Sequence, residues 1–552
     1  MRTILCIIIL LSVVGCARDN NETVIAQIGD FSVSEESFEY AFADFYRRTG
    51  RSINVNSLSK KQILESEINK LALVQYAYDE GIADHPTNQL EKERIRQKVM
   101  INRVIQTDYL DTMRVSEQEV RQLFYDFNTY VRASHLYASN LDEANKLMQR
   151  LEAGESFERL AGEIFENPYL ARNAGDLGYF TVDEMDISLE KAAFRAKKGE
   201  IVGPIKTAMG YSIVKVTDKN IKPLITEFEF ANRKPRFEKF ALEQKQKLFK
   251  LQYVTDFARN LDIDQSYFQN MYEAYLNDPL GFQQADEWTL PAIPKDAFKY
   301  EGNSLDSELF NQVFELTTMN ERNAVEGQKS FKEFIQGIAF RVYHIERSSD
   351  FDQEDWSYVN ASIERTWHAR LQNEVKNHLL ATLRIPEDSL RSFYQQDPSI
   401  FDAPLTLKLK RIRTRTEQDA EQAVSELKLG IAFMQVLKTY TAFNQDLISE
   451  GEMGWVKIKD LGTLASKVKE MEEGDIVGPL EYQSAEWLVL VCEGKKEPHP
   501  QSFDQAKEDV EGTLLALWHQ KAIKDVIQKT KNRHEVWRDI DKVSTIKLTH
   551  LQ

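Results

Sequence analysis

The chain has 552 residues, 42% of them apolar. This length is more than one hydrophobic core usually supports, so we predict several folded domains rather than a disordered chain. Its 70 basic and 87 acidic residues leave a formal charge of -17. Because no long block of Lys and Arg is segregated from this acidic background, the composition argues against nucleic-acid partners.

The first residues have the pattern of a bacterial lipoprotein signal. An apolar run from Ile4 to Val14 is too short to span a bilayer but suits the core of a signal peptide. It ends in Gly15-Cys16, as a lipobox does, so we expect residues 1–15 to be removed and the Cys16 thiol to be lipidated. The alternative is an ordinary secretory signal in which Cys16 stays a free thiol.

Lipidation would place the mature protein in the cell envelope. Several acyl chains together anchor a protein stably to a membrane. Ala17 and Arg18, rather than Asp, follow the cysteine, which favours the outer membrane and a periplasm-facing protein. Residues 16–23 would form the tether.

Only one cysteine, Cys492, remains after the signal peptide and the lipidated residue are set aside, so the mature chain can form no internal disulfide. Cys492 follows an apolar run, which favours a small buried side chain over a catalytic thiol.

Strand and helix patterns then alternate. Val24–Asp30 is typical of a strand and turn, Ser34 can cap the next helix, and residues 24–126 are predicted to be largely helical. Ser116 opens a further helix that runs through Tyr125.

A β-then-α unit follows and is repeated. Val131–Tyr137 predicts a strand, and apolar residues at i, i+3, i+4 and i+7 from Ala144 predict the next helix. The same spacing returns 276 residues later from Ala420, and even the preceding helix recurs. The chain therefore carries two related α/β domains, at residues 127–219 and 403–494.

The remaining segments show no chemical motif. Residues 220–402 are charged and largely helical, with an irregular part around Trp288–Gly302, and residues 495–552 contain an amphipathic helix from Phe503. The acidic residues 350–355 lack the pattern of a calcium loop, which favours a solvated turn. The nine histidines show no metal-ligand spacing, so we expect no metal and no cofactor.

Residues 131–219 resemble the parvulin family of peptidyl-prolyl cis-trans isomerases. The resemblance rests on the segments Ala133–Leu136, Gly154–Ala161, Gly175–Phe180, Met185, Gly199–Thr207 and Gly210-Tyr211. The layout of the whole chain is similar to that of SurA-type and PrsA-type periplasmic foldases. The resemblance implies an α+β multidomain fold in which helical, chaperone-like regions accompany two parvulin-like α/β domains.

The implied chemistry is rotation about an X-Pro bond, whose barrier of about 18–20 kcal/mol comes from amide resonance. A dry, apolar slot for the proline ring favours the twisted amide, which is less polar than the planar one. No nucleophile, metal or cofactor is needed.

The resemblance assigns roles to individual residues. The proline slot would be lined by Leu177, Met185 and Leu189. The polar and catalytic positions would be His135, Asn167, Thr207 and Ser212, with Met185 and Leu189 also contributing to catalysis. Three positions depart from the family pattern: Asn167 replaces Cys or Asp, Leu189 replaces Phe, and Ser212 replaces a second His. Because each replacement removes a group that active parvulins use, we expect attenuated activity.

The second copy is degenerate, because Arg411 stands at the position of His135. Phe443, Met453 and Trp487 would bind unfolded chains if they are exposed, or would be ordinary core residues if they are buried.

The sequence thus predicts an isomerase and chaperone for exported and outer-membrane proteins. Its partners would be unfolded polypeptides with X-Pro bonds, and the membrane through the lipid anchor, but not nucleic acid. The alternatives are an inactive holdase and a lipoprotein assembly scaffold that binds peptides through its parvulin-like domains.

Overall fold

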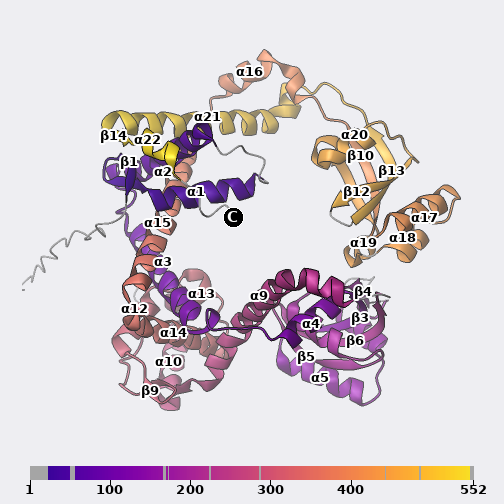
Figure 1. Ribbon diagram of the computed structural model, residues 1–552, viewed down its shortest axis with the longest axis horizontal. Helices are drawn as coiled ribbons and strands as arrows, with labels where there is room; N and C mark the ends of the chain where they lie inside the picture. Colours follow the sequence, from indigo (N-terminus) through magenta and orange to yellow (C-terminus); the bar gives the residue numbers. More distant parts are fainter. Residues whose placement is uncertain are drawn as a thin grey trace, which may run out of the picture.

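The computed structural model describes residues 23–49, 56–165, 170–171, 173–222, 226–284, 288–441, 443–483 and 486–546. Figure 1 shows a ring of four bodies, with two helical lobes on the left and two α/β domains on the right. The architecture confirms the predicted α+β multidomain fold. None of the described helices is both long and apolar enough to cross a membrane.

The first α/β domain is a four-stranded antiparallel sheet covered by helices. Its strand order is β4-β3-β6-β5, so the longest strands, β3 and β6, lie in the centre. The predicted helix start at Ser116 is confirmed, because its side chain accepts the Glu119 N–H while the Glu119 carboxylate accepts the Ser116 N–H. Its elements are α4 (Glu117–Phe127), β3 (Thr129–Ala138), α5 (Leu141–Glu152), α6 (Phe157–Ile164), β4 (Asp176–Phe180), α8 (Ile187–Arg195), β5 (Ile201–Thr207) and β6 (Gly210–Ile221).

The second α/β domain repeats this topology, with strand order β11-β10-β13-β12. Cys492, on β13, is buried and unpaired, in agreement with the expectation of a small core residue. The domain contains α16 (Glu387–Gln396), β10 (Thr406–Thr414), α17 (Glu417–Lys428), α18 (Phe433–Tyr440), α19 (Asn444–Ile448), β11 (Glu452–Lys457), α20 (Ala465–Val468), β12 (Ile476–Gln483) and β13 (Glu486–Lys496).

The first helical lobe combines both ends of the described chain. A small sheet of order β14-β1-β2 packs with helices from residues 35–79 and 503–545. Lobe one contains β1 (Val24–Ile28), β2 (Phe31–Ser34), α1 (Glu35–Arg48), α2 (Ser57–Asp79), α21 (Phe503–Arg533), β14 (Val536–Arg538) and α22 (Ile540–Thr545). The next helix of the chain, α3 (Pro86–Ile105), leaves this lobe and packs on the other one.

The second helical lobe is formed by the middle of the chain around a sheet of order β7-β8-β9. Its core is rich in aromatic side chains, among them the fully buried Phe282 and Phe331. Lobe two contains α9 (Glu227–Asn260), β7 (Asp262–Ile263), α10 (Gln265–Asn277), α11 (Pro279–Gln284), β8 (Phe298–Tyr300), β9 (Asn303–Ser304), α12 (Ser307–Glu315), α13 (Met319–Asn323) and α14 (Gln328–Arg347). The next helix, α15 (Gln353–Thr382), leaves this lobe and packs on α2 and α21 of lobe one.

The two lobes are copies of one another, so the duplication is larger than the sequence pattern indicates. Phe38 and Phe42 on α1 recur 272 residues later as Phe310 and Phe314 on α12, and all four side chains are buried. In each lobe a hairpin precedes this helix and accepts a third strand on the same side. The middle region is therefore the counterpart of the N-terminal region.

The third strand of each lobe arrives from the other half of the chain. Strand β7 lies in the last part of the first half but pairs with β8, whereas β14 lies in the last part of the second half and pairs with β1. The long helices that lead to these strands follow the same rule, since α9 packs on α14 and α21 packs on α2. Each half of the chain begins in one lobe and ends in the other.

The acidic segment at 350–355 is used to start a helix. Asp352 caps α15 by accepting the Asp355 N–H, and Asp355 forms an ion pair with Arg103 on α3. These contacts hold the lobes together at the α3–α15 crossing.

Candidate active site

The three residues expected to line the proline slot lie together. Leu177 on β4 and Leu189 on α8 belong to one buried cluster, and Met185, in the turn between these elements, packs against it. The cluster covers one face of the sheet, whereas α5 and α6 cover the other. An apolar surface is thus assembled where the resemblance places the proline ring.

A buried carboxylate holds the turn that carries Met185. Glu190 is 3% exposed and accepts three backbone N–H groups: from Glu184 and Met185 on Oε1, both at 2.7 Å, and from Asp183 on Oε2 at 3.1 Å. The turn needs this support, because Asp183 has a left-handed backbone with φ of 70°. Burial raises the pKa of Glu190.

Asp186 connects this turn to the opposite rim of the slot. Its Oδ1 caps α8 by accepting the Ser188 N–H at 2.9 Å, and its Oδ2 accepts the Ala208 N–H at 3.0 Å. Ala208 lies in the β5–β6 hairpin directly after Thr207, whose hydroxyl donates to the Gly210 carbonyl at 3.2 Å. Thr207 therefore lies in the hairpin that Asp186 connects to the Met185 turn, and its role in the site stays a prediction.

The sequence reasoning did not identify Glu190 and Asp186. Carboxylates at the start of a helix are common for electrostatic reasons, so neither residue looks unusual in the sequence. The only available signal was the spacing of Asp186 and Glu190 on either side of Leu189.

His135 lies on β3, on the same face of the sheet as the slot. Burial lowers its pKa to about 4, so the ring is neutral near pH 7. The ring packs beside Phe165 with centroids 5.4 Å apart, and no described residue hydrogen-bonds to its Nδ1. A neutral ring at this position would add no charge next to a bound amide.

Ser212 takes the position of the second histidine on β6, with 4% of its surface exposed. In the sheet register, Ser212 lies opposite Tyr137 whereas His135 lies opposite Val214, so the two side chains are on one face but one step apart. Among the described residues no hydrogen bond joins them. Asn167, the remaining predicted residue, lies outside the described residues.

The glycine of the Gly175–Asp176 motif permits a close contact with the backbone of His135 on β3. Gly175 has a φ of 65°, and a Cβ there would lie 2.1 Å from the His135 carbonyl oxygen. The carbonyl group of Gly175 itself accepts the His135 N–H at 2.9 Å. Asp176 is buried and binds the Arg132 guanidinium, which fixes β4 against β3.

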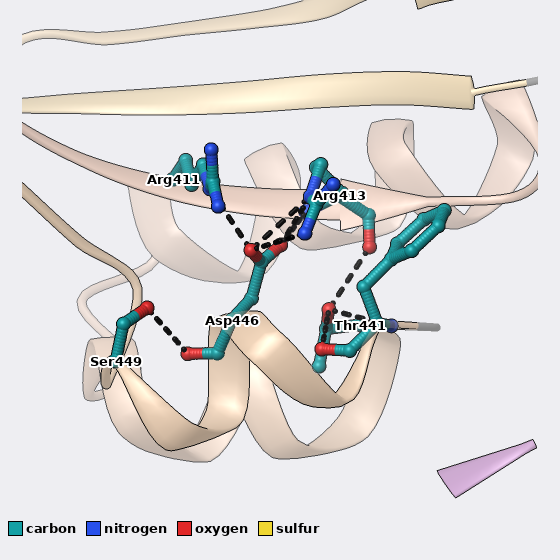
Figure 2. Close-up of polar contacts among 6 residues, drawn as sticks. Arg411, Arg413, Thr441, Asp446 and Ser449 are labelled. Carbon is teal, nitrogen blue, oxygen red and sulfur yellow. Dashed lines mark hydrogen bonds and ion pairs between the residues drawn. The ribbon is translucent and has the colours of Figure 1, made fainter. Parts of the chain in front are cut away.

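Where the first α/β domain has His135, the second has a cluster of charged side chains. Figure 2 shows Arg411 and Arg413, both on β10, converging on the Asp446 carboxylate from α19. Asp446 is 0% exposed and also accepts the Arg413 backbone N–H at 3.2 Å. This domain therefore has charged groups where the first domain is neutral and apolar.

The three residues proposed to bind clients in the second domain are not a shared exposed surface. Met453 and Trp487 pack against two different core clusters, and Phe443 is partly buried beside Arg413, whose guanidinium lies 4.4 Å from the ring centroid. For Met453 and Trp487 the core interpretation holds.

Comparisons with known proteins identify the family. Models described as "PPIC-type PPIASE domain" match residues 117–220 and 385–508. "Foldase protein PrsA" of Geobacillus kaustophilus is 28% identical over 230 residues, which is 40% of this chain and 80% of that protein. "Foldase protein PrsA" of Caldanaerobacter subterraneus is 30% identical over 212 residues, 35% of this chain and 67% of that protein. The chain belongs to the parvulin-type peptidyl-prolyl isomerases.

Solved structures include similar proteins. The PrsA isomerase of Bacillus anthracis is 23% identical, covers 38% of this chain and 88% of its own length, and gives a TM-score of 0.21. A structure described under the SurA-like chaperones PEB4 and Cj1289 of Campylobacter jejuni is 22% identical, covers 44% of this chain and 99% of its own, and gives a TM-score of 0.20.

The family confirms the expected activity class: the chain is a peptidyl-prolyl cis-trans isomerase and foldase. The relatives named PrsA foldases also support the coarser prediction of an extracytoplasmic protein that acts on unfolded polypeptides. The roles of individual site residues, the lipid anchor and the domain limits stay predictions. Within the part of the chain that the structure describes, no group of three or more His, Cys, Asp or Glu residues gathers as a metal site would.

Proposed function

We propose that the first parvulin domain performs the isomerisation and that its catalytic surface is the apolar slot of Leu177, Met185 and Leu189. The observation that carries the proposal is the placement of this slot on the same sheet face as the neutral, partly buried His135. A proline ring held there leaves water, and the preceding amide loses the solvation that favours its planar, polar form. Lowering the barrier by about 4 kcal/mol would accelerate rotation about a thousandfold.

The departures from the family pattern predict a slower enzyme. Leu189 keeps the slot apolar but has no flat aromatic face, and Ser212 forms no hydrogen bond with His135 among the described residues. Asn167 offers hydrogen bonds without the negative charge of Asp. Each of these replacements should weaken the stabilisation of the twisted amide, although the apolar slot itself remains.

The second parvulin domain is proposed to be non-catalytic. Arg411 and Arg413 with Asp446 put charged groups at the position that corresponds to His135 of the first domain. Charged groups there would stabilise the polar, planar amide rather than the twisted one. Its contribution to folding would come from binding and from its contact with the first domain.

The clients are proposed to be exported polypeptides, including outer-membrane proteins, with X-Pro bonds. The apolar run before Cys16 supports export, and lipid on Cys16 would hold the ring near the membrane, on the periplasmic side of the outer membrane. Metabolic labelling with a fatty acid tests this: we expect label in the wild type and none in Cys16→Ser, and an unlabelled wild type would contradict the anchor.

Proline-limited refolding of a model protein tests the catalytic proposal. Uncatalysed isomerisation takes tens to hundreds of seconds, so acceleration by micromolar amounts of the full chain is easily measured. Met185→Ala should reduce the acceleration by about tenfold, the loss that about 1.4 kcal/mol of apolar contact would cause. Met148→Ala is the matched control, since Met148 packs on the opposite face of the sheet.

If the wild type does not accelerate refolding, the catalytic proposal is wrong and the inactive holdase becomes the better description. Suppression of client aggregation without faster refolding would support that alternative. Capture of a single folded partner, rather than of many unfolded chains, would favour the assembly scaffold.

A further inference from the structure

An arginine of the second parvulin domain contacts the turn that carries Met185 in the first. Arg415, directly after β10, donates from Nη2 to Oε2 of Glu184. Its guanidinium also lies 5.5 Å from the ring centroid of Tyr130 in the first domain. Figure 1 shows this junction on the right, where α19 meets β4 and closes the ring.

Glu184 is in the supported turn rather than on a free surface. Its Oε2 also accepts the Thr181 N–H at 2.9 Å, and its own N–H is one of the three held by Glu190. The next residue is Met185, whose side chain packs on the proline slot. The Arg415 contact therefore acts on the outer side of a turn whose inner side forms the slot.

Arg415 is itself held in place by its own domain. Its guanidinium lies 5.3 Å from the centroid of Phe443, and Arg413 lies 4.4 Å from the same ring. Arg413 in turn binds Asp446. A continuous series of contacts thus joins the ion cluster of the second domain to the Met185 turn of the first.

The contact has no counterpart in the other direction. The position equivalent to Arg415, 276 residues earlier, is Ser139, which precedes the helix cap Asn140 as Arg415 precedes the cap Thr416. The hydroxyl of Ser139 donates to Glu143 within its own domain. Among the described residues, an arginine at this position is thus found in the degenerate domain, and it contacts the domain that contains His135.

We propose that Arg415 is a positioning residue for the isomerase reaction and that the second parvulin domain completes the proline slot of the first. The inference rests on the proposed catalytic slot. The side chains of Arg415 and Glu184 are 24% and 29% exposed, so water screens their interaction less than that of a free surface pair. With the contact made, the turn holds Met185 at the slot, and without it the turn loses its contact with the second parvulin domain.

Kinetics of the full chain test the proposal. Arg415→Ala should raise KM for an X-Pro substrate three- to tenfold and change kcat less than twofold, because the slot wall binds the ring before and during rotation. Arg415→Lys should recover only part of the loss, since lysine keeps the charge but not the planar stack on Phe443 and Tyr130. Arg415→Ala and Glu184→Gln should be strongly non-additive when combined, as expected for two partners in one contact.

Arg391→Ala is the matched control. Arg391 binds Glu387 and lies 4.4 Å from the ring centroid of Phe503, so it makes the same two kinds of contact away from the junction. Its removal should leave KM unchanged. An equal rise of KM in Arg391→Ala, or no rise in Arg415→Ala, would overturn the proposal.

Hydrogen exchange separates this inference from the catalytic proposal. In Arg415→Ala the amides of Glu184 and Met185 should exchange at least tenfold faster, while amides on β6 keep their rates. Unchanged rates at both amides overturn the positioning role. Faster exchange in a chain whose wild type shows no isomerase activity would refute the catalytic slot alone and leave the contact between the domains established.

Discussion

The backbone N–H of Asp539, near the end of the described chain, donates to the carbonyl of Ile25, near its beginning, at 2.8 Å. The equivalent bond in the other lobe runs from Asp264 to Ala297 at 2.9 Å. Asp539 and Asp264 each cap the helix that follows the exchanged strand. The two lobes therefore exchange the same structural piece in the same register, and each is complete only with a segment from the other half.

Cutting the chain between the halves should leave one particle. We expect a chain with a protease site inserted between Gln284 and Trp288 to elute at its original size after cleavage, because α21 stays packed on α2 and α9 on α14. The two fragments should separate only in denaturant that unfolds the lobes. Size-exclusion chromatography followed by denaturing electrophoresis measures this.

The uncut insertion variant is the control for damage caused by the insertion. Release of a free fragment in native buffer would show that the exchanged strands contribute little to holding the halves together.

Acid should destabilise the chain through buried histidines, with His344 as the clearest case. Its Nε2 accepts from the Tyr253 hydroxyl and its Nδ1 donates to the Phe340 carbonyl, so the neutral ring is satisfied. Burial lowers its pKa to about 4. The unfolded chain takes up this proton near pH 6.5, so stability is complete above pH 6.5 and is lost as the pH falls toward 4.

The expected loss is about 1.4 kcal/mol per pH unit below 6.5 for one such histidine. Urea unfolding at pH 7.5 and pH 5.0 should therefore show a difference that is about 1–2 kcal/mol smaller in His344→Gln than in the wild type. Equal pH dependence of the two proteins would contradict a neutral, buried His344.

Much of the site could be predicted from the sequence, because Leu177, Met185 and Leu189 occupy fixed places in a local motif. The groups that hold them could not. Glu190 and Asp186 read as ordinary charges at the start of a helix, and their function depends on a turn whose backbone folds back over them. Arg415 lies in a loop, and no local pattern indicates that its partner is in another domain.

The parvulin duplication was visible in the sequence, but the exchange between lobes was not. Strand β7 has only two residues and β14 only three, too few for a period-two pattern to be recognised. Which strand such a segment joins is decided by the long helices α9 and α21 that carry it, and the packing partner of a helix is a property of the whole fold.

Substitution of Glu190 should destabilise the Met185 turn, more strongly in Glu190→Ala than in Glu190→Gln. Glu190→Ala leaves three backbone N–H groups without their acceptor, and we expect about 2–3 kcal/mol of lost stability and about a tenfold fall in kcat/KM. Glu190→Gln should cost less, because one oxygen still serves Glu184 and Met185 and only the Asp183 N–H faces the new amide. Refolding kinetics and urea unfolding give both quantities.

Glu200→Gln is the control for this series, since the Glu200 carboxylate accepts a single exposed backbone N–H, that of Lys197. The loss of stability in Glu200→Gln should be below 1 kcal/mol, and the fall in kcat/KM should be below twofold. Similar losses in Glu200→Gln and Glu190→Ala would mean that the turn is not held by Glu190.

Removing one member of the ion cluster in the second domain should destabilise the protein more than replacing all three members with apolar residues. Asp446→Ala leaves Arg411 and Arg413 close together without their counter-charge in a largely buried place, and such losses cost about 3–5 kcal/mol. Replacing all three residues with Met or Leu removes the buried charges together, so the triple variant should be more stable than Asp446→Ala although it carries more changes.

Urea unfolding combined with hydrogen exchange on β10 measures both variants and assigns the loss to the second domain. A triple variant that is less stable than Asp446→Ala would show that the arginines stabilise the domain by contacts other than Asp446. The stacking of Arg413 on Phe443 is the first such contact to examine, because it leads to Arg415 and the junction with the catalytic domain.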